Sequence, residues 1–308
     1  MANFQDIIEK LLLSDTGDLN ELARIAGKDP KTFYIDADFK RCDLTGQNLD
    51  QMDTRYADFS RAKLSEMEQA LWEIRKRIHT HKLDKNWEEY VVSNRALAAI
   101  LNVFAARAKG PDQILFIQET VSAYRAALTV YTKDQNADNW ANIQNNFAAS
   151  LAALSKYAPN ELASTLLEEA VIALRAALTV HTKSQQREEW ADLQNNLGNV
   201  FADMAERTPG EAGSKLHGQS LIAYRAALTV NTKSENLEQW AKTISNLAIL
   251  EIQRAEHDGR QDPRPYYETA LAYVDDALTV VDPVIMAPQY AKASGLREQL
   301  LKALSADD

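Results

Sequence analysis

Few residues of this chain have the types and spacing that catalysis or metal binding requires. Its five histidines are scattered without a common spacing, and no carboxylate pattern beside them resembles a zinc site. The one cysteine, Cys42, has no partner for a disulfide within the chain. No Gly-x-x-x-x-Gly-Lys phosphate loop is present, and no Ser-His-Asp set can be assigned. We therefore expect a protein that is not an enzyme and that uses no metal ion and no cofactor.

The composition limits the classes of partner. The 308 residues carry a net charge of −10, which argues against broad binding to nucleic-acid backbones. No apolar run reaches the roughly eighteen residues that a membrane span needs. The first residues lack the basic start of a secretion signal. These features predict a soluble cytoplasmic protein with no membrane partner.

The strongest pattern is a repeat with a period of fifty residues. The segment YRAALTV at 124–130 returns in similar form at 174–180 and 224–230. Aromatic residues recur with the same spacing: Tyr90, Trp140, Trp190, Trp240 and Tyr290. Five copies in constant phase cover about residues 65–304. A period of this length indicates a solenoid, in which each unit buries its apolar face only against its neighbours.

Each copy contains two amphipathic helices. In the first helix of one copy, large residues recur at the spacing of a single helical face: Ile143, Phe147, Leu151 and Leu154. Prolines separate the first helix from the second: Pro111, Pro159, Pro209 and Pro263. The phase predicts a lone second-type helix near 66–82, four helical pairs and a closing first-type helix near 287–304. Lys133, Lys183 and Lys233 are expected to end second helices, where cations complement exposed carbonyl groups.

The motifs within the copies resemble those of a known family. Leu197-Gly198-x-x-Phe201, followed by Ser220-x-x-x-Tyr224-x-x-Ala227, is similar to the tetratricopeptide (TPR) pattern. The period is fifty rather than about 34 residues, so the chain resembles the long-repeat bacterial type of the family. The resemblance implies a mainly α fold, a right-handed α-solenoid of antiparallel helix pairs, over residues 66–308.

The first 65 residues follow a different pattern. From Tyr34, a large residue returns at almost every fifth position, for example at Phe39, Leu44 and Leu49. This spacing resembles the pentapeptide-repeat family, which implies a short β-helix cap over residues 31–65 with Cys42 as a small inward filler. Residues 1–30 are expected to form a helical hairpin before the cap.

The resemblance also places the candidate site. In the TPR family the first helices line a concave groove, and their ligand-facing places correspond here to Arg95, Asn145, Asn146, Asn195, Asn196, Asn199, Asp203, Asn246 and Gln253. A side-chain amide has both a donor and an acceptor, so a row of amides can pair with the backbone of an extended peptide. The alternative is that the amides bond to neighbouring helices. Recurrence in three copies favours that alternative for Asn146, Asn196 and Asn246.

Two other rows have structural and functional interpretations. Arg75, Arg125, Arg175 and Arg225 form a row on the second helices, and pairing with nearby acids is favoured over an acidic partner. The tryptophans are favoured as wedges between repeats over stacking anchors in a groove. A chaperone-type site for a C-terminal carboxylate is not expected, because Arg95 is the only cation at the relevant place of the first helices.

The sequence thus predicts a scaffold that holds a protein or peptide partner in the groove of a TPR superhelix. Two alternatives remain: a pentapeptide-type mimic or inhibitor of nucleic acid, and a TPR sensor of a small peptide signal. Self-association into a homo-oligomer is also left open.

Overall fold

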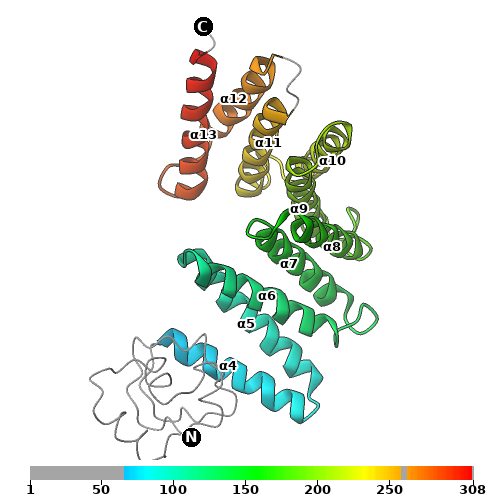
Figure 1. Cartoon of the computed structure of the whole chain (residues 1–308). Coiled ribbons are helices and arrows are strands. Elements are labelled where there is room, and N and C mark those ends of the chain that lie inside the picture. The colour runs from blue at the N-terminus through cyan, green and yellow to red at the C-terminus, as the bar shows by residue number, and fades with distance from the viewer. Residues whose placement is uncertain (1–65, 258–261, 307–308) are drawn as a thin grey trace, which may run out of the picture. The chain divides into compact units, whose positions relative to one another are not determined.

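In a computed structural model, residues 66–257 and 262–306 are described (Figure 1). They contain ten helices, and none of these residues lies in a strand. The predicted hairpin at 1–30, the predicted cap at 31–65 and Cys42 lie outside the described residues. The chain divides into two compact units, residues 1–77 and 78–308, and the boundary falls within helix α4 (Glu66–Leu83).

The predicted alternation of first and second helices is confirmed. The first helices are α5 (Trp87–Arg107), α7 (Ala137–Ser155), α9 (Arg187–Glu206), α11 (Leu237–His257) and α13 (Ala287–Ala306). The second helices of the four pairs are α6 (Pro111–Leu128), α8 (Asn160–Leu178), α10 (Glu211–Leu228) and α12 (Arg264–Leu278). No described helix is long and apolar enough to cross a membrane.

Packing follows the order of the chain, as a repeat array requires. The two helices of a pair contact one another most extensively, and each second helix also packs against the first helix of the next pair. First helices additionally contact one another in succession, in the pairs α7 and α9, α9 and α11, and α11 and α13. The first helices of this part of the unit therefore form a continuous layer, with the second helices packed against it.

The ends of the helices have local causes. Gly110 and Gly210 have φ angles of 66° and 71°, a region open to glycine, and directly precede α6 and α10. Pro111 is the first residue of α6, where its missing N–H costs no helical hydrogen bond. The second helices end at a leucine followed by threonine, and the Thr129 hydroxyl donates to the Ala126 carbonyl at 2.7 Å.

The expectation that three lysines end the second helices was wrong. These helices end five residues earlier, and the lysines lie in the connections that follow. Lys133 Nζ donates to Thr179 Oγ1 at 2.9 Å, and Lys233 Nζ donates to Asp276 Oδ1 at 2.6 Å. Each of these two cations thus joins its own pair to the second helix of the next pair.

The buried faces follow the predicted periodicity. Ile143, Phe147 and Leu151 are buried on α7, whereas Leu154 is half-buried. Trp240 is 7% exposed and belongs to one core cluster with residues of α9, α10 and α12. This position confirms the wedge interpretation for Trp240.

Candidate partner-binding face

The predicted site residues lie on the layer of first helices, and most of them bond from one helix to the next. We call this surface the amide face and define it by the nine predicted residues, Arg95, Asn145, Asn146, Asn195, Asn196, Asn199, Asp203, Asn246 and Gln253. Asn196 Nδ2 on α9 donates to Asn145 Oδ1 on α7 at 2.8 Å. Since an amide is both donor and acceptor, its recurrence in three copies allows such a bond between successive helices.

A denser group of bonds joins α9 to α11. Asn246 Nδ2 donates to Asn195 Oδ1 at 3.2 Å and to Asn199 Oδ1 at 3.0 Å. Asn195 Oδ1 also accepts from the Thr243 hydroxyl at 3.2 Å. The Tyr224 hydroxyl donates to Asn199 Oδ1 at 2.7 Å, which ties α10 to the same group. With Asn195 only 2% exposed, this group has the geometry of helix packing.

In the bonds of the outer members of the face, one of the two side chains is charged. Arg95 Nη1 on α5 donates to Asn139 Oδ1 on α7 at 3.1 Å. Gln253 Nε2 on α11 donates to Glu206 Oε1 on α9. These contacts extend the lateral bonding from α5 to α11.

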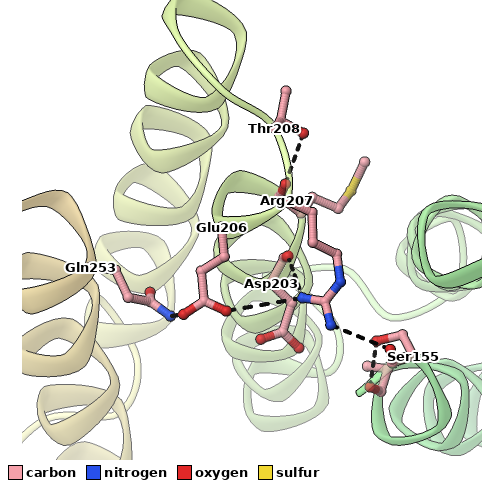
Figure 2. A network of polar contacts seen from close by, with 8 residues as sticks. Ser155, Asp203, Glu206, Arg207, Thr208 and Gln253 are labelled. Atoms are coloured by element: carbon pink, nitrogen blue, oxygen red, sulfur yellow. Dashed lines mark hydrogen bonds and ion pairs between the residues drawn. The ribbon is translucent and has the colours of Figure 1, made fainter. Parts of the chain in front are cut away.

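Arg207 connects α9 to α7 beside Asp203 (Figure 2). Its guanidinium donates to the main-chain carbonyl of Asp203 at 3.2 Å and to that of Ser155 at 3.3 Å. It also lies 4.0 Å from a Glu206 carboxylate oxygen. Sequence analysis missed Arg207, because the places fifty residues away on either side hold Tyr157 and His257, and only Arg107, two copies earlier, repeats it.

Asp203 is the perturbed acid of the face. Burial raises the pKa of its carboxyl group above the ordinary value, and the charge of Glu206 adds to this rise. The positive charges of Lys156 and Arg207 oppose it. Burial is the largest of these effects, so the protonated form of Asp203 is favoured relative to an exposed aspartate.

Asn146 differs from the other amides. It is exposed, and its side chain makes no hydrogen bond within the described part of the chain. The packing role therefore fits Asn196 and Asn246 but has no contact to support it at Asn146. Ala99 and Ala149, which hold the same repeat place as Asn199, are also exposed.

Lys292 is a second residue that sequence analysis did not place on this face. Its ammonium donates to Asn246 Oδ1 at 3.0 Å, from α13 to α11. Lys242, fifty residues earlier, holds the same place in its repeat, and this spacing is the signal that could have identified the position.

Neither the arginine row on the second helices nor the residue types that bind metal ions form a reactive site among the described residues. Arg125 forms an ion pair with Glu169 at 2.9 Å, which is the favoured pairing for this member of the arginine row. Among the described residues, no group of three His, Cys, Asp or Glu side chains is placed to hold a metal ion.

No known protein-family model matches this sequence, and no curated protein does either. What the amide face does is therefore interpreted from its own geometry.

Proposed function

We propose that this chain is a right-handed, long-repeat array of the TPR type that acts as a non-catalytic protein-interaction scaffold. A peptide or partner segment would lie along the amide face. The observation that carries the proposal is the lateral bonding of first helices, through which side chains of α5, α7, α9, α11 and α13 form one connected polar surface.

This bonding supports binding because it orders the surface before a partner arrives. Side chains that are already held in one rotamer lose little conformational entropy on association. Beside them, exposed Asn146 offers a free donor and acceptor to a peptide backbone. The exposed alanines at 99 and 149 add small side chains in the same layer.

The contacts between helices support the concave character of this face. Successive first helices from α7 to α13 contact one another. Among the described residues, no two second helices contact one another to a similar extent. A layer with closer spacing on one side bends toward that side. The amide face would then be the inner side, where an extended segment touches several repeats at once.

The test adds bulk to the face without removing any of its bonds. We would compare wild type with Ala99→Arg/Ala149→Arg and with the control Ser122→Arg/Ala272→Arg, whose sites are exposed on second helices. Both variants add the same charge and use a good helix former. Circular dichroism would first establish that all three proteins are equally folded.

Cross-linking and mass spectrometry of cell extracts would then identify bound proteins. The proposal expects a partner that binds wild type and the control variant but is lost from the first-helix variant. A partner lost only from the control variant would place binding on the second helices and contradict the proposal.

A further inference from the structure

Helix α5 has a row of apolar side chains along one side. Val92 and Val103 are 50% and 48% exposed, and Ala99 and Ala106 are exposed as well. Ala96, in the same row, is half-buried. We call these five residues the α5 row. Among the described residues, α5 and α7 do not contact one another to the extent that the later first helices do, so no neighbouring first helix covers the row.

The repeat fold does not require apolar residues in this row. The equivalent places are mostly polar on α7 and entirely polar on α9: Asn142, Asn146, Ala149, Ala153 and Lys156, then Asp192, Asn196, Asn199, Asp203 and Glu206. These helices pack in the same layer without apolar side chains there. Exposed apolar side chains that gather on one face are typical of a surface that another molecule covers. The α5 row is therefore a candidate docking surface.

The spacing of the α5 row is that of a coiled-coil seam. Its residues follow one another at intervals of four, three, four and three positions, which is the alternation of the two core places of a heptad. A seam of this kind packs its side chains into the holes of a second helix over several turns. An extended peptide, whose side chains alternate every two residues, would match only part of a row that follows one helix. The spacing favours a helix as the occupant.

Charged residues lie at both ends of the α5 row and on its flank. Acids outnumber lysines at the N-terminal end, where the chain carries Asp84, Glu88 and Glu89 beside Lys82 and Lys85. Cations outnumber acids at the C-terminal end, where it carries Arg107 and Lys109 beside Asp112. Arg95, on the flank, donates to the Asn139 amide and forms no ion pair with the described residues. A helix with acids in its first turn and cations in its last turn is complementary to these ends when it lies antiparallel to α5.

We propose that the α5 row docks an amphipathic helix of a partner protein, about four turns long and antiparallel to α5, with leucine-like side chains in its heptad core places. The proposal rests on the proposed function, and it names the secondary structure and chemistry of the partner at one end of the layer of first helices. Three residues of the row are alanines, which let the second backbone approach closely and leave space for larger side chains of the partner. Arg95 provides a cation on the flank for a partner carboxylate.

A second copy of the chain fits the α5 row less well. Two identical rows would place mostly alanine against alanine, so they would bury little apolar surface. Stable interfaces bury roughly 1,200 Å² or more in total. Longer aliphatic side chains fill the space beside the alanines and bury more, which favours a different protein as the source of the helix.

The test uses a fluorescein-labelled synthetic peptide of about 21 residues, three heptads, with leucine in the core places, glutamate in the first turn and lysine in the last. A matched peptide has the same composition and a scrambled leucine spacing. The proteins are wild type, Val92→Gln/Val103→Gln, and the control Ile172→Gln/Ile222→Gln. The control removes two aliphatic side chains that are each 69% exposed on second helices. Glutamine is a better helix former than valine, and circular dichroism would establish that all three proteins are equally folded.

We expect fluorescence polarisation to show that the heptad peptide binds wild type and the control. It should bind the α5-row variant roughly tenfold more weakly, as the lost burial of two half-exposed valines implies. The scrambled peptide should bind wild type more weakly than the heptad peptide, and circular dichroism should show that the heptad peptide gains helix when it binds. Absent binding to wild type, equal affinities for the two variants or for the two peptides, or no gain of helix would overturn the proposal.

Two further measurements address the orientation and the identity of the occupant. A peptide with its glutamate and lysine turns exchanged should bind more weakly at low salt, where charge pairs are least screened. Equal or tighter binding of that peptide would overturn the antiparallel orientation. Light scattering should find wild type and the α5-row variant in the same oligomeric state. A wild-type dimer that Val92→Gln/Val103→Gln dissociates would assign the row to a second copy and overturn the proposal.

The two proposals can fail separately. A natural partner that is lost from the Ala99→Arg/Ala149→Arg variant but binds Val92→Gln/Val103→Gln with full affinity would leave the scaffold function standing and remove the docked helix from it. If the heptad peptide binds as expected but no natural partner is lost from either variant, the α5 row keeps its specificity for a helix and the scaffold function fails.

Discussion

The amide face has two regions that use the same repeat places differently. In the C-terminal region, Asn195 and Asn199 on α9 are both bonded to Asn246 on α11. In the N-terminal region, the place of Asn199 is taken by exposed Ala99 and Ala149. One region has amides joined across helices, and the other has small side chains open to solvent.

The difference follows from the neighbours of each place. The Tyr224 hydroxyl, on α10, donates to Asn199. Tyr124 holds the same place on α6, but the residue of α5 at the repeat place of Asn199 is Ala99, whose side chain has no acceptor. The charge that acts on the Tyr124 hydroxyl comes from Arg95. A repeat position therefore has no role of its own. The role depends on which donors and acceptors the adjoining helices provide, and the open region is where a partner has room to bind.

The largest expected effect in this comparison comes from Gly198→Ala. A Cβ at Gly198 would lie 2.5 Å from two ring atoms of Tyr224. The ring cannot easily move, because it is buried and its hydroxyl is bonded to Asn199. We expect a loss of about 2 kcal/mol in the free energy of unfolding, since overpacking outweighs the better helix propensity of alanine. Urea unfolding followed by tryptophan fluorescence measures it.

A double variant provides the control for this steric cause. The second pair of helices has Ala148 and Leu174 at the places of Gly198 and Tyr224. Gly198→Ala/Tyr224→Leu should therefore be more stable than the sum of its single variants predicts. Strict additivity would show that the tyrosine ring is not the obstacle.

Asn195→Ala should have the next largest effect. Its buried Oδ1 accepts from Thr243 and Asn246, and both donors retain a second acceptor, Gln239 O and Asn199 Oδ1 respectively. The cost should therefore be about 1–2 kcal/mol rather than that of two orphaned donors. Asn145→Ala, at a half-buried place with one bond, should cost about 0.5 kcal/mol. Equal losses in urea unfolding would contradict the division between the two regions.

A smaller, pH-dependent effect is expected for Asp203→Asn. Burial raises the folded-state pKa of Asp203 above its ordinary 3.8, so the folded state binds the proton more tightly than the unfolded state. Stability from this group is greatest below pH 3.8 and falls as the pH rises from there through the folded-state pKa. Asparagine removes this fall, so the variant should gain stability relative to wild type at neutral pH. Melting temperatures of both proteins at about four pH values between pH 3 and pH 7 would measure the difference. A difference independent of pH would exclude titration of Asp203 as its cause.

Asn146→Ala should have the smallest effect on folding. Its exposed side chain makes no bond in the described residues, so the change in unfolding free energy should be within about 0.5 kcal/mol. The same variant should weaken partner binding if the open region is the binding surface. A large loss of stability in urea would instead show a packing role for Asn146.

The helical part of the fold could be predicted because its signals are local and repeated. The apolar spacing on α7, the prolines before the second helices and the fifty-residue phase each indicate the same helix boundaries. Lys133 and Lys233 were placed wrongly, since sequence order cannot distinguish a cation at the end of its own helix from one that reaches the next pair. The structure describes neither residues 1–30 nor 31–65, so the hairpin and the cap stay predictions.

The sequence by itself determined which residues share a repeat place and which face of each helix is apolar, because both depend on spacing along one chain. Only the tertiary structure decided which polar residues of that place bond to a neighbour and which stay open. The bonds of Asn246 to Asn199 and Lys292 and the link from Arg207 to Ser155 join residues 46 to 52 positions apart. A hydrogen bond depends on the distance and direction between two atoms of different helices, and those are set by helix packing rather than by periodicity.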